Sequence, residues 1–195
     1  MGREFELKYG ATAARQQSIA EHFGSFETIS METTYYDTPD QLLAARKLTL
    51  RRRLENGVSV CTLKTPGDSH GRGEWETKCD RIEDALYELC KLSQWEELPG
   101  LLVRGVTPIC GARFTRRAKT IELPDCTVEL ALDAGVLLGG GREMPLCEVE
   151  VELKSGSEEA AAAFGAALAG EFGLVPEKKS KFRRALALAK GESHV

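Results

Sequence analysis

The stretch Glu4-Phe5-Glu6-Leu7-Lys8, near the start of the sequence, alternates charged and apolar residues. Side chains two positions apart on a β-strand point to the same face, so the alternation predicts a strand with one charged face and one apolar face. A single half-exposed strand shows the same alternation. The pattern becomes informative because it recurs in later segments of the chain.

Four later segments repeat the alternation, at residues 49–55, 74–78, 128–133 and 148–154. The first of them is strongly basic, with Arg51 and Arg53 on one face, whereas the last is mainly acidic. If the sheet curls into a barrel with these charges inward, both signs face one polar lumen. Buried charges are costly unless they are paired or bound to a metal, so such a lumen needs an ionic ligand.

The length of the chain predicts a single domain over residues 1–195, with enough residues for a substantial core. No apolar run approaches the ~20 residues that cross a bilayer, and the N-terminal residues lack a signal-peptide pattern. We therefore expect a cytoplasmic protein that has no membrane partner. The net charge of −4 gives no basic field that would favour a nucleic acid partner.

The cysteines and histidines narrow the chemistry of any site. The six cysteines show no CxxC spacing and are expected to be reduced thiols. The three histidines are far apart in sequence, which argues against a Cys/His zinc site and against a nucleophile activated by histidine. A bound metal would therefore have carboxylate ligands, which favours Mg²⁺ or Mn²⁺.

Turn signals and apolar spacing predict an α+β fold that is mainly antiparallel. Asn56-Gly57 is a strong hairpin signal, and Gly139-Gly140-Gly141 is expected to be a flexible hairpin tip rather than a phosphate cradle. Helices are expected at 12–23, 82–95, 157–172 and 178–190. Strands are expected at 4–8, 31–37, 47–54, 58–65, 73–79, 108–117, 118–123, 126–133 and 146–154.

The motif Glu4-x-Glu6-x-Lys8 resembles the signature of the CYTH superfamily, also called triphosphate tunnel metalloenzymes. Further blocks resemble the family in the same order, at residues 35–40, 48–53, 62–64, 72–76, 114–116, 128–133, 147–153 and 180–181. The ordered set covers nearly the whole chain and looks most like the bacterial inorganic triphosphatase branch. Members of that branch often carry a second, helical domain; the chain ends before one, so we do not expect their polyphosphate-linked role.

The resemblance implies an eight-stranded, closed antiparallel β-barrel with flanking helices, whose tunnel holds a triphosphate and Mg²⁺ or Mn²⁺. The implied reaction is metal-dependent hydrolysis of inorganic triphosphate to diphosphate and phosphate. Thiamine triphosphatase and class IV adenylate cyclase use a similar tunnel and stay open as alternatives, as does a non-catalytic polyphosphate- or nucleotide-binding module. The oligomeric state is also open, a homodimer included.

Closure of the barrel would bring the acidic strands at the two ends of the sheet together. Four carboxylates that close repel one another without a cation. The expected metal ligands are therefore Glu4, Glu6, Glu148 and Glu150, with Glu152 as a weaker fifth. Asp133 is expected either to help bind a second metal or, with Glu74, Glu76, Lys78 and Glu129, to hold the arginines in position.

The basic residues are expected to bind phosphate oxygens, the arginines through bidentate forks. The set is Lys8, Arg51, Arg53, Lys64, Arg116 and Lys181, with Arg113 as a weaker alternative to Arg116. Lys8 is expected to bind phosphate or to assist proton transfer, and Lys181 to reach in from the C-terminal helix. The residues expected to take part in catalysis are Lys8, Arg53, Lys64 and Glu150. Tyr35, Tyr36 and Trp75 are the aromatic residues considered for an organic group, although the strand parity of Trp75 points outward.

Overall fold

The structure is a computed structural model that describes residues 5–68, 71–93 and 99–192. Glu4 lies outside the described residues. The strands are β1 (Glu6–Gly10), β2 (Glu27–Asp37), β3 (Thr49–Glu55), β4 (Val58–Asp68), β5 (Gly71–Lys78), β6 (Thr107–Glu122), β7 (Cys126–Gly139), β8 (Arg142–Gly156) and β9 (Val175–Pro176). The helices are α1 (Ala13–Phe23), α2 (Leu42–Ala45), α3 (Ile82–Ser93), α4 (Pro99–Arg104), α5 (Glu158–Phe172) and α6 (Lys181–Lys190).

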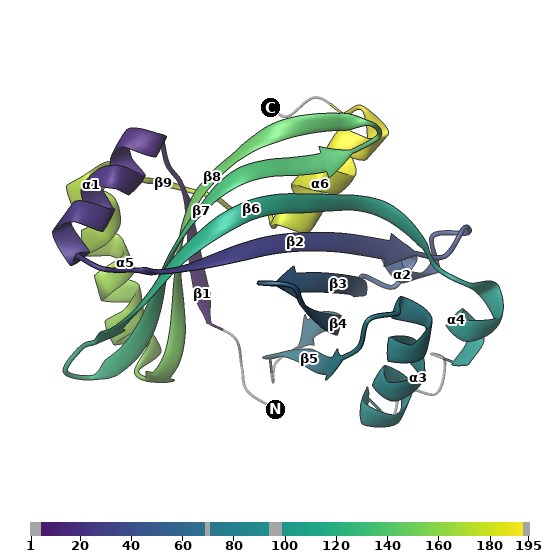
Figure 1. Ribbon diagram of the computed structural model, residues 1–195. Helices are drawn as coiled ribbons and strands as arrows, with labels where there is room; N and C mark the ends of the chain where they lie inside the picture. The colour runs from purple at the N-terminus through teal and green to yellow at the C-terminus, as the bar shows by residue number, and fades with distance from the viewer. Residues whose placement is uncertain (1–4, 69–70, 94–98, 193–195) are drawn as a thin grey trace.

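All strands pair antiparallel in one sheet, in the order β5-β4-β3-β2-β6-β7-β8-β1-β9. The predicted α+β fold with an antiparallel sheet and flanking helices is therefore confirmed. The long strands β2, β6, β7 and β8 arch across the molecule, with α1 and α5 at one end and α3 and α4 at the other (Figure 1). Among the described helices, none has the length and hydropathy that a bilayer-spanning helix needs.

The predicted closure of the barrel differs from the observed hydrogen bonding. No backbone ladder joins β5 to β1 within the described residues, and the sheet has nine strands rather than eight. The added strand β9 pairs with Tyr9 and Gly10 of β1, on the edge opposite β8. It thereby occupies part of the edge through which β1 would otherwise meet β5.

Several element boundaries differ from those predicted. The residues predicted as two strands, 108–117 and 118–123, form one continuous strand, β6, because it pairs with β7 without interruption from Gly111 to Glu122. The strands β7 and β8 extend as far as Gly139 and Arg142, so only Gly140-Gly141, both with positive φ, form the hairpin tip. The helix expected at 178–190 begins at Lys181, because the Ser180 side chain caps it by accepting from Arg183 N.

The convex face of the sheet is apolar and is covered by helices. Val128, Leu130, Leu132, Val149 and Val151 pack with α1 and α5, as the alternation of β7 and β8 predicts. A second apolar cluster joins β3 and β4 to α3 through Leu50, Leu63, Leu86 and Leu89. The charged residues of these strands are therefore left on the concave face.

The concave face changes from charged to apolar along β7 and β8. Asp133 and Glu148 are opposite each other in the ladder, and further along the same face stand Leu137 and Leu146. The apolar part is covered by α6, which packs its buried Ala185 there. The helix therefore lies inside the curve of the sheet, with its N-terminal residues beside the charged part.

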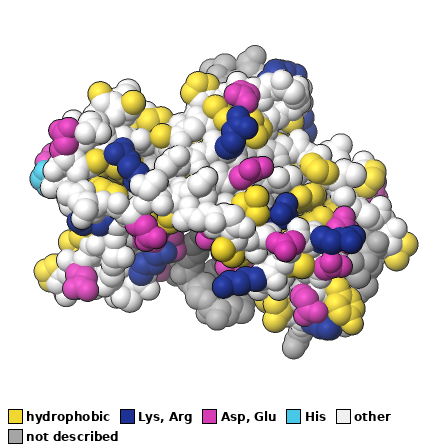
Figure 2. All heavy atoms as spheres, in the orientation of Figure 1, with side chains coloured by type: hydrophobic (Ala, Val, Ile, Leu, Met, Phe, Trp, Pro, Cys, Tyr) yellow, Lys and Arg dark blue, Asp and Glu magenta, His cyan; other side chains and the backbone are white. Residues whose placement is uncertain are grey.

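Surface charge is distributed differently from the charge inside the curved sheet. On the face in Figure 2, acidic and basic side chains are intermingled. This face of the molecule therefore does not show the segregation of acidic from basic strands that the sequence shows.

Gly139 allows α6 to lie directly on the β7–β8 hairpin. A Cβ atom at Gly139 would lie 2.5 Å from Ala185 O and 2.7 Å from Ala189 N, both of them backbone atoms. We expect Gly139→Ala to destabilise the protein by about 1–3 kcal/mol, because the helix must move away. Thermal unfolding measures this effect. The matched control is Gly170→Ala, whose Cβ meets nothing within 4 Å and which should instead raise stability through helix propensity. Equal effects of the two substitutions would contradict this account of the packing.

Candidate functional site

The concave face of the sheet and the start of α6 enclose a cavity of about 790 Å³. Its walls include residues of both β1 and β5, although no backbone ladder joins these two strands within the described residues. Carboxylates from β1, β7 and β8 form one side, and cations from β3 and β4 form another. The charged residues along the wall are Glu6, Lys8, Arg51, Arg53, Glu55, Lys64, Glu74, Glu76, Arg116, Glu129, Glu150, Glu152, Lys154 and Lys181.

The basic side has hydrogen-bond donors to spare. Arg51 Nη2 lies 3.6 Å from Glu74, and Arg53 Nη1 lies 3.1 Å from Glu55. The Nε atoms of Arg51 and Arg53 are nevertheless buried and have no hydrogen-bond partner within the described part of the chain. Burial and the neighbouring charge of Arg53 lower the pKa of Arg51. Two guanidinium groups whose buried Nε donors are unused favour the binding of an anion.

Lys64 extends this basic side from the neighbouring strand. Its Nζ lies 2.8 Å from Glu74, which also faces Arg51 at 3.6 Å. A carboxylate shared by two cations holds both of them in place without neutralising both. Glu76 also lies 3.8 Å from Arg51, and Glu55 pairs with Arg53. What this side offers to an anion is therefore its unused donors rather than a net charge.

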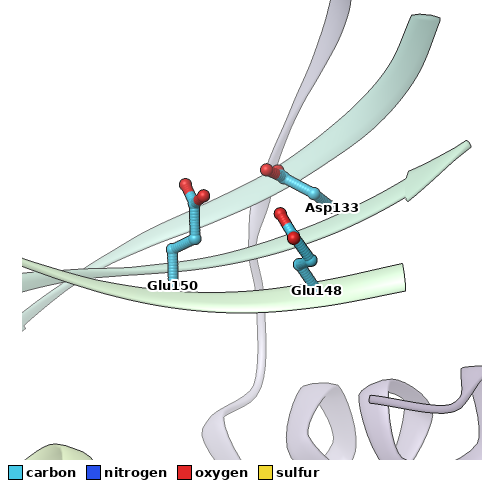
Figure 3. Close-up of side chains that lie close together, drawn as sticks. All are labelled: Asp133, Glu148 and Glu150. Atoms are coloured by element: carbon cyan, nitrogen blue, oxygen red, sulfur yellow. The ribbon is translucent and has the colours of Figure 1, made fainter. Parts of the chain in front are cut away.

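The acidic side contains a compact cluster of Asp133, Glu148 and Glu150. Each of them offers one carboxylate oxygen, and these atoms all lie within 4.8 Å of one another. Figure 3 shows the three side chains reaching from β7 and β8 toward the same space. All three are buried. Oxygen ligands of this kind suit Mg²⁺ or Mn²⁺, so the chemistry of the donor set fits a divalent cation.

Three cations of the chain compensate this cluster. Lys181 Nζ lies 2.8 Å from Asp133, 2.6 Å from Glu148 and 2.5 Å from Glu150. Arg116 binds Asp133 bidentately, with Nε and Nη2 at 2.8 and 2.7 Å, and also contacts Glu150. Arg184 contacts Glu148. This pairing stabilises charges that would be costly to bury alone.

Glu6 faces the cavity beside this network and has an unusual protonation equilibrium. Burial and the nearby charge of Glu150 raise the pKa of Glu6 from 4.5 to about 8. Burial also opposes ionisation of Glu150, but the charges of Lys181 and Arg116 outweigh it and hold the pKa of Glu150 well below its ordinary value. Lys8 Nζ lies 3.9 Å from Glu6 and only partly offsets the effect. A bound cation would favour the ionised form of Glu6, which burial and Glu150 disfavour.

Most of the predicted site residues are brought together in the cavity. Those that line it are Glu6, Lys8, Arg51, Arg53, Lys64, Arg116, Glu150, Glu152 and Lys181. Asp133 and Glu148 lie directly behind the wall and are fully buried. The wall also includes Glu74, Glu76 and Glu129, each expected to face the lumen, but not Lys78.

The structure also shows where the residues lie for which the sequence allowed alternative roles. The side chain of Arg113 is 62% exposed and pairs with Glu143 at 3.2 Å, so Arg116 is the arginine of this strand that faces the cavity. Tyr35 lines the cavity, whereas Tyr36 and Trp75 pack on the opposite face against the α3 cluster.

Two residues of the network were not predicted. Gln16 of α1 is buried and donates from Nε2 to the carbonyl oxygens of Asp133 at 2.9 Å and Glu148 at 2.7 Å. The sequence gives no signal for this contact, because it joins distant segments. Arg184 does have a signal: it stands three positions after Lys181, which places both on one face of the helix.

Comparison with known proteins gives a consistent picture. The CYTH domain model matches residues 2–186. The inorganic triphosphatase of Haemophilus influenzae is 31% identical over 167 residues, which cover 80% of this chain and 47% of that protein. The chain thus spans about half the length of that curated relative.

Solved structures share the fold. The Hippeastrum protein HpAC1, described as having a dominant triphosphatase activity, has a TM-score of 0.66 at 18% identity, with 98% of this chain and 97% of that chain covered. PH1819 from Pyrococcus horikoshii OT3 has a TM-score of 0.60 at 24% identity, with 96% and 99% covered.

The raised pKa of Glu6 generates a prediction for stability in the presence of a chelator. Because the pKa is about 8 in the folded protein and 4.5 ordinarily, the folded state binds the extra proton between these values. The contribution of Glu6 to stability is therefore full below about pH 4.5 and is lost as the pH rises through 8. We expect Glu6→Gln to raise the melting temperature relative to the unmodified protein, increasingly from pH 5 to pH 9. A difference that does not change with pH would contradict this assignment, and Glu83→Gln, an exposed change, is the control.

Proposed function

Because the chain belongs to the CYTH domain family, we propose that it hydrolyses inorganic triphosphate to diphosphate and phosphate with the help of a divalent cation. The observation that carries the proposal is the composition of one cavity. Guanidinium groups with buried, unused Nε donors lie on one side, and a compact carboxylate cluster lies on the other. The similarity to the inorganic triphosphatase of Haemophilus influenzae supports the choice of substrate.

The basic side would bind the phosphate groups. A triphosphate carries several negative charges, and Arg51 and Arg53 offer the unused donors that match phosphate oxygens. Lys64 adds a cation from β4, and Lys181 one from the opposite wall. Lys8 lines the cavity from β1, opposite Glu150 in the ladder, where it would bind phosphate or assist proton transfer. Binding would thus hold the chain of phosphates across the cavity.

The acidic side would hold the metal. Glu6 and Glu150 line the cavity and are the first choice of ligands, with Glu152 beside them, while Glu4 would extend the set from the start of the chain. Asp133 and Glu148 stand behind this layer. When bound, Mg²⁺ or Mn²⁺ would neutralise charge on the phosphates and favour ionisation of a coordinated water. Arg116, held bidentately by Asp133, would fix Glu150 in position rather than move freely toward phosphate.

The chemistry requires no covalent intermediate with the protein. Water attacks the terminal phosphorus, the bond to the bridging oxygen breaks, and diphosphate leaves. Catalysis of this kind rests mainly on positioning and on neutralisation of charge. The cavity supplies both through rigid strands rather than through loops.

We further propose that the curved sheet functions as a closed tunnel. Residues of β1 and β5 line the same cavity although no ladder joins these strands. A triphosphate bound between them would be contacted from both edges. The proposed functional unit is one domain over residues 1–195. The six cysteines are free thiols, which supports a reducing compartment such as the cytoplasm.

Release of phosphate from tripolyphosphate, ATP and thiamine triphosphate, with and without Mg²⁺ or Mn²⁺, tests the proposal. We expect metal-dependent cleavage with a clear preference for tripolyphosphate. Cleavage of none of the three would contradict the hydrolase function. Formation of cyclic AMP from ATP would then distinguish a cyclase from a binding module.

Substitutions in the cavity should reduce this turnover. Arg53→Ala and Glu150→Gln are each expected to lower kcat/KM about a hundredfold or more, because each removes a charge that faces the phosphates or the metal. The control is Arg113→Ala, an exposed arginine on the outer side of the sheet, which should retain nearly full activity. Full activity of both cavity variants would contradict the proposed site.

A further inference from the structure

Glu148 is a fully buried carboxylate, and each of its two oxygens contacts a different cation of α6. Lys181 Nζ lies 2.6 Å from its Oε2 atom, and Arg184 Nη2 contacts its Oε1 atom. A fully buried carboxylate needs compensation of its charge, and removal of its partner is strongly destabilising. Glu148 therefore requires at least one of these two cations at all times.

The two cations differ in where they stand. Lys181 lines the cavity and also lies 2.5 Å from Glu150 and 2.8 Å from Asp133. Arg184 is not part of the cavity wall; its second partner is Glu177, at 3.6 Å. Arg184 is therefore committed to Glu148, whereas Lys181 is shared between the cluster and the cavity.

The positions of Lys181 and Arg184 on α6 determine these different contacts. Ser180 caps α6, so Lys181 is its first residue and Arg184 stands three positions later on the same face. The packing of Ala185 and Gly139 holds the helix against the hairpin. Both side chains consequently approach Glu148 from one side, in a fixed order along the helix axis.

Binding of an anion in the cavity would change the contacts that Lys181 makes. To contact phosphate oxygens its ammonium group must turn away from at least part of the carboxylate cluster. Without Arg184, this movement would leave Glu148 buried and uncompensated, so Lys181 would be held back. With Arg184 in place, Glu148 keeps a partner while Lys181 moves.

We propose that Arg184 is a positioning residue that neutralises Glu148 and thereby frees Lys181 to bind the triphosphate. Glu148 in turn anchors α6 at the cavity through Arg184. The inference rests on the proposed binding of a triphosphate in the cavity, but it does not depend on hydrolysis. Arg184 itself touches no substrate in this account.

Calorimetric titration of tripolyphosphate in the presence of a chelator tests the inference without metal or turnover. The variants are Arg184→Gln, Glu148→Gln and the double variant, with Arg183→Gln as the matched control. Arg183 is the adjacent, exposed arginine of the same helix, so its loss removes the same charge from the surface.

We expect Arg184→Gln to raise the Kd for tripolyphosphate about tenfold or more, because Lys181 becomes the one remaining partner of Glu148. The double variant should bind within about threefold of Glu148→Gln, because the charge that Arg184 compensates is then absent. Arg183→Gln should bind like the unmodified protein. If Arg184→Gln alone fails to fold, a tenfold loss of binding between Glu148→Gln and the double variant would still overturn the inference.

Two outcomes overturn the inference while the proposed binding stands. One is unchanged binding by a folded Arg184→Gln variant. The other is a tenfold loss on removal of Arg184 in the Glu148→Gln background, which would mean that Arg184 acts independently of Glu148. Failure of the unmodified protein to bind tripolyphosphate in the presence of the chelator would overturn this inference but not the proposed function, which metal-dependent release of phosphate tests separately.

Discussion

The compensation of buried charge is the constraint on which the rest of this structure depends. Asp133, Glu148 and Glu150 are buried side by side, and three cations from distant parts of the chain meet them. Arg116 comes from β6, whereas Lys181 and Arg184 come from α6. The network therefore ties the C-terminal helix to the middle of the sheet. Removal of any one member would leave a charge in a poorly solvated place, which explains why the strands and the helix must be assembled together.

The same constraint determines where α6 can lie. Along β7 and β8 the concave face changes from charged residues to Leu137 and Leu146, and α6 covers the apolar part. Gly139 lets the helix backbone approach the hairpin closely. This contact brings Lys181 to the boundary between the apolar and the charged parts, where it reaches the carboxylates and the cavity at once. An apolar packing contact thus sets the position of a functional charge.

The segregation of charge across the cavity links the fold to the proposed chemistry. Carboxylates on one side favour a divalent cation, and burial together with the charge of Glu150 raises the pKa of Glu6 there. Guanidinium groups with unused donors on the other side favour an anion. A metal at the carboxylates and a phosphate chain at the guanidinium groups would complement both sides when they bind together. The curvature of the sheet makes this possible, because it brings strands that are distant in the ladder to face one cavity.

The sequence by itself determined which side chains share the concave face, because alternation along a strand depends only on local geometry. It thereby predicted cavity residues of the strands such as Glu6, Arg53 and Glu150, whereas the resemblance of its ordered motifs predicted the family and the role of Lys181 on the C-terminal helix. It did not determine that Gln16 would support Asp133 and Glu148, that Arg184 would pair with Glu148, or that β9 would occupy part of the edge of β1. Those features depend on how helices dock and which strand edges meet. Such contacts join residues far apart in the chain, so only the tertiary structure decides them.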